Sequence, residues 1–238
     1  AHVPDLNDFV DGLKVLLAPG GTITMEFAHL LRLVEGNQFD TIYHEHFSYL
    51  SLIVTERVFA AHGLTIFDVE ELSTHGGSLR IYARHAEEPD RPVLQSVEKL
   101  RRKEMDAGYG KIETYLGFGK RVAETKRKLL DFLITARGQG KHIAGYGAPG
   151  KGNTLLNYCG IRTDFVDYTV DRNPYKQGQF LPGTLIPIFP PERLAETRPD
   201  YILILPWNLK DEVMAQLAYA RDWGAQFVVP IPEVEVYP

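Results

Sequence analysis

The chain has 238 residues, of which 44% are hydrophobic and 24% charged, a balance typical of a globular protein with one large or two small domains. The net charge of −5 gives no basic field for nucleic acid, and no apolar run approaches the roughly 20 residues of a membrane span, so we expect neither partner. The single cysteine, Cys159, excludes an intrachain disulfide, and the N-terminal AHVPDLNDF lacks the features of a signal peptide, so we expect a cytoplasmic protein.

The first part of the chain is typical of one unit of a wound α/β sheet. Apolar residues recur at helical spacing over residues 4–17, which predicts a helix that the Pro-Gly-Gly turn at 19–21 ends. The apolar run TITMEF at 22–27 predicts a buried strand. The segment at 30–49 shows no clean periodicity, and we expect it to be irregular.

Three further elements precede a long charged segment. Helical spacing at 51–62 predicts a helix, and apolar runs at 64–72 and 78–84 predict a pair of strands that closes a sheet edge. Residues 89–137 are charged and helical in pattern, with a break at two glycines. We expect an arm of two helices there.

From residue 141 onward, strand and helix patterns alternate. The predicted strands are 142–148, 165–171, 201–205 and 227–231, and the predicted helices are 153–158, 190–196 and 209–223. Such alternation indicates a parallel, doubly wound sheet, so the predicted fold class is α/β.

A glycine-rich segment, GYGAPGKG at 145–152, follows a predicted strand and opens a helix. Gly145 and Gly147 permit a tight turn, and the start of the helix presents free N–H groups to an anion. The match to G-x-G-x-x-G suggests a dinucleotide site, with Asp171 where a ribose-binding acid ends the next strand. Lys151 favours a phosphate.

Two other interpretations of this segment stay open. The spacing also fits a P-loop, but Gly152 stands where a magnesium-binding Ser or Thr is needed. The segment is also compatible with a tight strand-to-helix turn that holds no ligand. The loop after the second strand, with Asn173, Tyr175 and Lys176, lies where parallel sheets bind ligands.

A second candidate site is the heptapeptide YHEHFSY, which begins at Tyr43. Tyr43 and His46 would share a face on a helix, whereas His44 and His46 would share one on a strand. A histidine is a natural general base near neutral pH. The alternatives are histidines that satisfy buried backbone groups, and a metal site completed by His2 or His75. Because the H-E-x-x-H motif is absent, we predict no metal.

Six segments of the chain together resemble the sugar C-methyltransferases of deoxysugar biosynthesis. They are AHVPDL, PGGTITMEF, FDTIYHEHFSYLS, LTIFDVEELSTHGGSLRIYA, GYGAPGKGNTLLNY and VDRNPYKQGQFLPGT. The resemblance covers nearly the whole chain, and the YHEHFSYLS and GYGAPGKGNT blocks are quite specific. It implies a protein with a zinc-binding domain, a class I methyltransferase domain and a C-terminal Rossmann-like domain. Such proteins use S-adenosylmethionine to methylate C3 of a nucleotide-linked 4-keto-deoxysugar, usually a dTDP-sugar.

The resemblance also implies how this chain is organised. Residues 1–86 are expected to form the C-terminal part of the methyltransferase domain, 87–140 a helical connector and 141–238 the second Rossmann-like domain. The zinc domain and the glycine-rich donor loop are expected to be missing, so the implied cofactor is S-adenosylmethionine, and zinc belongs to the missing part.

The resemblance places the active site at His2, Tyr43, Glu45 and His46. It implies that His46 removes the proton next to the ketone and that Glu45 orients it or stabilises its charged form. Tyr43 or His2 then donates a hydrogen bond to the enolate oxygen. His44 is an alternative base.

The glycine segment is expected to hold the diphosphate or the sugar of the substrate. The residues expected to bind it are Gly145, Tyr146, Gly147, Lys151, Asn153, Thr154, Asp171 and Lys176. Two alternative functions stay open at this point. One is an NAD(P)-binding oxidoreductase with Asp171 on the ribose, and the other is a non-catalytic fragment that binds a nucleotide-sugar.

Overall fold

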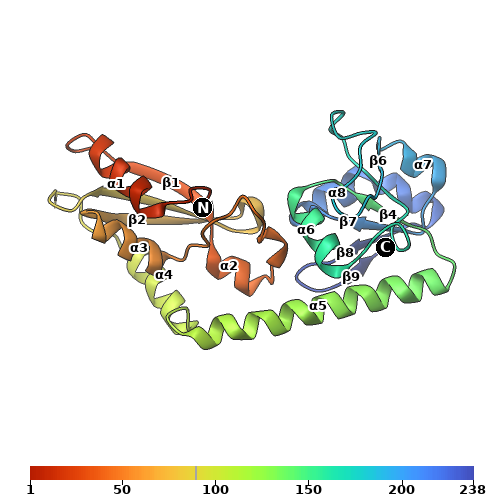
Figure 1. Ribbon diagram of the computed structural model, residues 1–238, viewed down its shortest axis with the longest axis horizontal. Coiled ribbons are helices and arrows are strands. Elements are labelled where there is room, and N and C mark those ends of the chain that lie inside the picture. Colours follow the sequence, from red (N-terminus) through yellow and green to blue (C-terminus); the bar gives the residue numbers. More distant parts are fainter. Residues whose placement is uncertain (89) are drawn as a thin grey trace. The chain divides into compact units, whose positions relative to one another are not determined.

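A computed structural model of the chain describes residues 1–88 and 90–238. Figure 1 labels most of the helices and strands. Pro89, the first residue of the predicted helical arm, lies outside the described residues. Within them, no helix is both long enough and apolar enough to cross a membrane.

The chain divides into two compact units. The first consists of Ala1–Gly36 and His44–Gly119, and the second of Asn37–Tyr43 and Lys120–Pro238. The short segment Asn37–Tyr43 therefore belongs to the second unit, although the residues before and after it belong to the first. The domain boundaries predicted after residues 86 and 140 stay a prediction.

The first unit contains a three-stranded antiparallel sheet. Its strands are β1 (Ile23–Ala28), β2 (Leu64–Leu72) and β3 (Ser78–His85), and its helices are α1 (Leu6–Leu16), α2 (Leu30–Glu35), α3 (Leu52–Ala61) and α4 (Gln95–Asp106). The strand order is β1-β3-β2. The predicted pair of strands is confirmed, but the pair does not simply close an edge, because β3 is the central strand and also pairs with β1.

The segment at 30–49, predicted to be irregular, contains a helix. α2 has 6 residues and buries Leu31, Leu33 and Val34. A helix this short presents fewer than two turns, so it leaves no periodic signal in the sequence. The prediction of an irregular segment is therefore wrong for α2.

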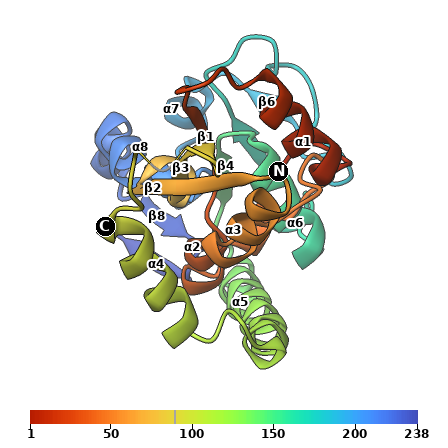
Figure 2. The same cartoon turned by 90° about the vertical axis from the view of Figure 1, so that its left-hand side faces the viewer.

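Local sequence explains where two helices of this unit begin. The Asp5 carboxylate accepts a hydrogen bond from the N–H of Asp8 at 3.0 Å, and the Ser51 hydroxyl accepts one from Val54 at 3.3 Å. Both side chains satisfy N–H groups that the first helical turn leaves unpaired. Helices α3 and α4 each pack against β2, and Figure 2 shows α3 beside that strand. The fully buried core includes Leu31, Leu52, Leu64, Leu79, Ile81 and Val97.

A buried ionisable pair connects three helices of the first unit. The Nε2 atom of His29, just before α2, lies 2.8 Å from Oε1 of Glu104 in α4, and both side chains are fully buried. The same carboxylate accepts the N–H groups of Leu52 at 2.8 Å and Ile53 at 2.9 Å, the first two residues of α3. Because a buried charge must be paired, the packing of these helices depends on Glu104.

The second unit contains a six-stranded sheet. Its strands are β4 (Ile143–Tyr146), β5 (Tyr168–Val170), β6 (Ile188–Phe189), β7 (Tyr201–Ile204), β8 (Gln226–Val229) and β9 (Glu235–Tyr237), and its helices are α6 (Gly150–Cys159), α7 (Arg193–Thr197) and α8 (Lys210–Gln216). Helix α5 (Ile112–Gly138) begins in the first unit and ends in the second. The order is β6-β5-β4-β7-β8-β9, parallel except for β9. The predicted α/β class with a Rossmann-like parallel sheet is confirmed.

Some local predictions for this unit need correction. The strand predicted at 165–171 is reduced to β5, because Val166 donates its N–H to the carbonyl of Arg162 in a turn. The helix predicted at 209–223 divides into α8 and the 3-10 helix Ala218–Trp223, where the backbone hydrogen bonds tighten. Strands β6 and β9 were not predicted, since each has too few residues to show alternation.

The order of the parallel strands defines a topological switch point between β4 and β7. The chain passes from β4 to β5 and β6 on one side, and then to β7 and β8 on the other. In open α/β sheets, ligands bind at the carboxyl ends of strands at such a point. The segments that follow β4 and β7 here are the glycine segment and residues 206–208.

Candidate functional site

The structure brings two of the predicted active-site histidines together in the first unit. The rings of His2 and His46 stack with their centroids 5.0 Å apart and their planes 11° from parallel. The rings of His46 and Tyr49 meet at an angle of 84°, with their centroids 6.0 Å apart. The N–H of Phe47 donates to the carbonyl of Ala1 at 2.8 Å, which fixes the two segments side by side.

The other residues of the heptapeptide have less confined surroundings. His44 and Glu45 are exposed in the turn that precedes His46, which is itself half-buried. Tyr43 is half-buried and belongs to the second unit. The described residues contain no group of three or more His, Cys, Asp or Glu side chains that could hold a metal ion.

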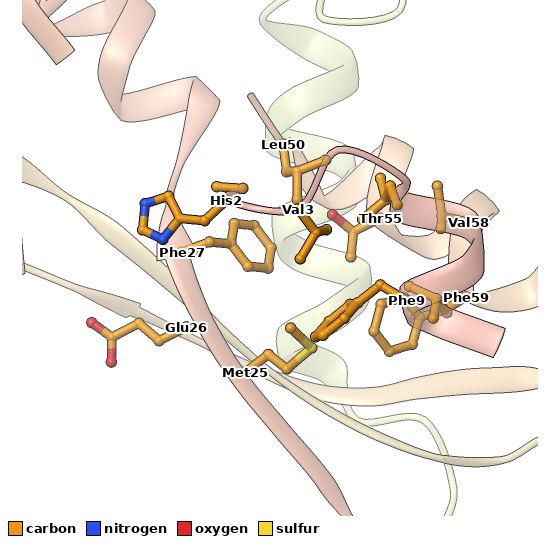
Figure 3. A pocket seen from close by; sticks show the side chains of 13 residues that line it. His2, Val3, Phe9, Met25, Glu26, Phe27, Leu50, Thr55, Val58 and Phe59 are labelled. Carbon is orange, nitrogen blue, oxygen red and sulfur yellow. The ribbon is translucent and has the colours of Figure 1, made fainter. Parts of the chain in front are cut away.

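His2 also lines a pocket of about 210 Å³ in the first unit. Figure 3 shows that Phe9, Met25 and Phe59 make its wall largely apolar. Glu26 lines it as well, but its carboxylate points away and accepts hydrogen bonds from Thr74 and Arg80 instead. The pocket therefore offers a hydrophobic surface with an imidazole.

In the second unit, close packing explains two glycines of the glycine segment. Gly147 has φ +86°, and a Cβ there would lie 2.7 Å from the Pro206 ring. A Cβ on Gly152 would lie 2.7 Å from Cβ of Leu205. The two glycines thus allow the turn after β4 and the first turn of α6 to approach the segment after β7 closely, at the switch point. The preceding Gly145 and Tyr146 end β4 and are buried.

Asp171 holds this turn in place. Its Oδ2 accepts the N–H of Ala148 at 2.7 Å, and its Oδ1 accepts that of Asn173 at 2.8 Å. Lys176 lies 3.5 Å from the same carboxylate and donates to the carbonyl of Ala148 at 2.9 Å. The predicted binding residues Asp171 and Lys176 therefore lie beside the glycine segment, where they bind its backbone.

Lys151 occupies the switch point itself. Its Nζ donates to Oδ1 of Asn208 at 2.7 Å and lies 4.7 Å from the centroid of the Trp207 indole. Burial lowers the pKa of Lys151, while Asp40 acts in the opposite direction. The structure thus brings together a half-buried cation and a turn of the kind that binds phosphates.

Thr154 and Asn153 make hydrogen bonds within helix α6, Thr154 through its side chain and Asn153 through its backbone carbonyl. The Thr154 hydroxyl donates to the carbonyl of Gly150 at 3.3 Å, and Asn157 donates to the carbonyl of Asn153 at 2.9 Å. Pro149 occupies the N-cap position of α6, and no side chain of the described residues caps the start of this helix.

Sequence reasoning missed a pocket of about 460 Å³ at the carboxyl ends of the strands. Tyr146, Arg172 and Tyr219 are among the residues that line it, and the Tyr146 hydroxyl donates to Gln216 at 3.1 Å. Burial raises the pKa of Tyr146. Two sequence signals pointed to this pocket: Tyr146 was among the predicted binding residues, and Arg172 directly follows the predicted Asp171.

The fold places the chain among α/β proteins with a Rossmann-like sheet. Residues 73–232 match the model of a family described as the C-methyltransferase C-terminal domain. The chain is 39% identical over 236 residues to the C-methyltransferase NovU of Streptomyces niveus, an alignment that covers 99% of this chain and 56% of that protein. The chain therefore belongs to the C-methyltransferase family, as its motifs indicated, and spans just over half the length of this relative.

Proposed function

We propose that the protein acts in the S-adenosylmethionine-dependent methylation of C3 of a nucleotide-linked 4-keto-deoxysugar, with a dTDP-sugar as substrate. Membership of the C-methyltransferase family supports methyl transfer as the reaction class. The observation that carries the proposal is the stacked pair of His2 and His46, because C-methylation next to a ketone needs a base to form the nucleophilic carbon.

We assign the first step, removal of the C3 proton, to side chains of the first unit and to Tyr43, which directly precedes His44 in the chain. The imidazole of His46 takes the proton from C3, and the electrons of the broken C–H bond form the enolate, whose charge develops on the ketone oxygen. His2 or Tyr43 donates a hydrogen bond to that oxygen and stabilises the charge. Glu45, the adjacent acid, stabilises the imidazolium that results.

The methyl donor supplies an electrophilic methyl group on a sulfonium. The pocket beside His2 does not fit such a donor, whose ribose and amino acid groups need polar partners. Its wall is largely apolar, and the Glu26 carboxylate is engaged elsewhere. We therefore assign no donor-binding residue in this chain. The step that we assign to its own residues is the formation of the enolate.

We assign the nucleotide part of the substrate to the second unit. Lys151 is a half-buried cation beside a glycine turn, which suits a diphosphate. Tyr146, Tyr219 and Arg172 offer aromatic and cationic surface in the neighbouring pocket, which suits a nucleoside. Asp171 already binds two backbone N–H groups, so nothing favours the ribose role that an oxidoreductase would require.

A methyl-transfer assay tests the proposal. Because this chain spans 56% of its C-methyltransferase relative, the assay uses the chain extended to the relative's full length. This protein is incubated with S-adenosylmethionine and a dTDP-4-keto-deoxysugar, and the product is analysed by mass spectrometry. We expect the product to gain the mass of one CH₂ group, and we expect His46→Gln to abolish this gain. His62→Gln should keep it. His62 is a suitable control because it lies in the same unit and its ring makes hydrogen bonds to Asn7 and Asp11. Tight NADH binding together with no methyl transfer would favour the oxidoreductase alternative instead.

A further inference from the structure

A buried carboxylate lies next to the proposed phosphate-binding lysine. Asp40 belongs to the 3-10 helix Phe39–Thr41 and is fully buried in the second unit. This short helix packs on α6, where the rings of Phe39 and Tyr158 meet at an angle of 61° with their centroids 5.3 Å apart. The segment thus delivers an acid to the helix whose first turn carries Lys151.

Asp40 is connected to Lys151 through an indole. Oδ2 of Asp40 accepts the indole N–H of Trp207 at 2.7 Å, and the Lys151 ammonium lies over the face of that indole, 4.7 Å from the ring centroid. Oδ1 of Asp40 has no hydrogen-bond partner within the described part of the chain. The side-chain hydrogen bond that the structure shows for this carboxylate therefore orients Trp207.

Stability alone does not explain an acid at this position. An apolar side chain of similar size would avoid the cost of burying a carboxylate. A carboxylate that accepts the indole N–H fixes the plane of the ring. Its negative charge also makes the ring more electron-rich, which strengthens the attraction of the ring for a cation over its face. Both effects help to hold the Lys151 ammonium, which lies over this face.

We propose that Asp40 and Trp207 are positioning residues that hold the Lys151 ammonium at the carboxyl ends of β4 and β7, ready for the diphosphate of a nucleotide ligand. Neither residue touches the ligand in this account. Asp40 fixes the indole, the indole face and Asn208 fix the ammonium, and the ammonium binds the anion. The inference rests on the proposed nucleotide-sugar function of the second unit.

The test uses two substitutions at residue 40 that differ in one respect. Asp40→Asn keeps an oxygen that accepts the indole N–H, whereas Asp40→Leu fills the same space without an acceptor. Trp207→Phe keeps a ring but removes the donor. Asp200→Asn is the matched control, since Asp200 lies just before β7 and pairs with Lys141 there. Binding of dTDP and of thymidine is measured by calorimetry, and folding by thermal unfolding.

We expect Asp40→Leu and Trp207→Phe to weaken dTDP binding about tenfold, the equivalent of one well-placed hydrogen bond. Asp40→Asn should stay within about threefold of the unaltered protein, and Asp200→Asn should equal it. Thymidine binding should be the same in all variants, because it lacks the diphosphate. A purely structural role for Asp40 would alter the unfolding temperature without this split between dTDP and thymidine.

The outcomes separate this inference from the proposed function. If Lys151→Ala loses dTDP affinity while Asp40→Leu and Trp207→Phe keep it, the positioning role is refuted and the proposed function stands. If these variants lose thymidine as strongly as dTDP, the positioning role is also refuted. If Lys151→Ala binds dTDP normally, or the unaltered protein does not bind it, the proposed nucleotide site is refuted.

A spectroscopic measurement adds a readout specific to the indole. The chain has two tryptophans, so Trp223→Phe leaves Trp207 as the sole fluorophore of that kind. We expect dTDP, but not thymidine, to change Trp207 emission as the diphosphate offsets the charge of the ammonium over the indole, and Lys151→Ala to abolish the change. Emission that responds equally to both ligands would contradict the account.

Discussion

Replacing Asp40 with asparagine should change how the stability of the second unit depends on pH. Burial raises the pKa of Asp40 from 3.8 to about 6, against the opposing effects of the Trp207 hydrogen bond and the Lys151 charge. Between these two values the folded chain keeps a proton that the unfolded chain has lost. The free energy of unfolding contributed by Asp40 therefore falls as pH rises through this window.

The size of this effect follows from the two pKa values. Their difference corresponds to about 3 kcal/mol, all of it lost between pH 3.8 and about pH 6. Below the window both states hold the proton, and above it both have released it, so the contribution is constant on either side. Asp40→Asn lacks this titration, and it keeps an acceptor for the Trp207 indole.

Urea unfolding followed by tryptophan fluorescence measures the effect. Trp207 and Trp223 both lie in the second unit, so their emission reports the unfolding of that unit. The free energy of unfolding of Asp40→Asn minus that of the unaltered protein should rise by about 3 kcal/mol from the acid to the neutral end of the window. Other titrating groups cancel in this difference.

Asp200→Asn provides the control with the opposite sign. Burial acts to raise the pKa of Asp200, but hydrogen bonds from Lys141 and from the N–H of His142 outweigh it and lower the pKa. Its contribution is present above the ordinary value and lost as pH falls below it, so the difference should be nearly flat in the Asp40 window. A flat difference for Asp40→Asn as well would refute the burial argument.

Three further predictions concern single side chains. Burial lowers the pKa of Lys151 below 10.5, so the affinity for dTDP should begin to fall at a lower alkaline pH than it would with an exposed lysine. Lys151→Arg should keep its affinity over the same pH range, because arginine stays charged, and calorimetry across pH measures both. The same pH dependence of affinity in the two proteins would oppose this prediction. Glu104→Ala removes the hydrogen-bond partner of the His29 Nε2 atom and of two N–H groups of α3. Hydrogen exchange in α3 should therefore report an opening free energy lower by about 3–5 kcal/mol. Unchanged protection would be inconsistent with the buried pair. Gly152→Ala should lower the free energy of unfolding in urea by about 1–3 kcal/mol, because the added methyl group meets Leu205. Gly150→Ala, whose methyl group meets open space, should change it little. Equal losses for the two variants would contradict the close packing of Gly152.

Elements with a complete local signal were predictable from the sequence. The apolar runs of β2 and β3 and the helical spacing of α1 and α3 predicted these elements nearly to their ends. Capping by Asp5 and Ser51 is also local, since each bonds an N–H three residues later. Local interactions of this kind act within one turn, so the residues that make them are visible together in the sequence.

The arrangement of Asp40, Trp207 and Lys151 could not be predicted, because these residues are far apart in the chain. Asp40 and Trp207 are separated by 167 positions, and nothing near Asp40 marks it as buried. The same holds for the assignment of Asn37–Tyr43 to the second unit, which depends on packing against α6. The stacked pair of His2 and His46 was expected only from the family resemblance, since spacing alone did not rank His46 above His44.

Hydrogen exchange at C3 of the sugar tests the role of the histidine most directly. A dTDP-4-keto-deoxysugar is incubated with the protein in deuterated water without methyl donor, and loss of the C3 proton signal is followed by NMR. We predict exchange with the unaltered protein and His44→Gln, and a rate about 10² to 10⁴ lower with His46→Gln, the usual contribution of a general base. Undiminished exchange in His46→Gln, or its loss in His44→Gln, would contradict the assignment of the base.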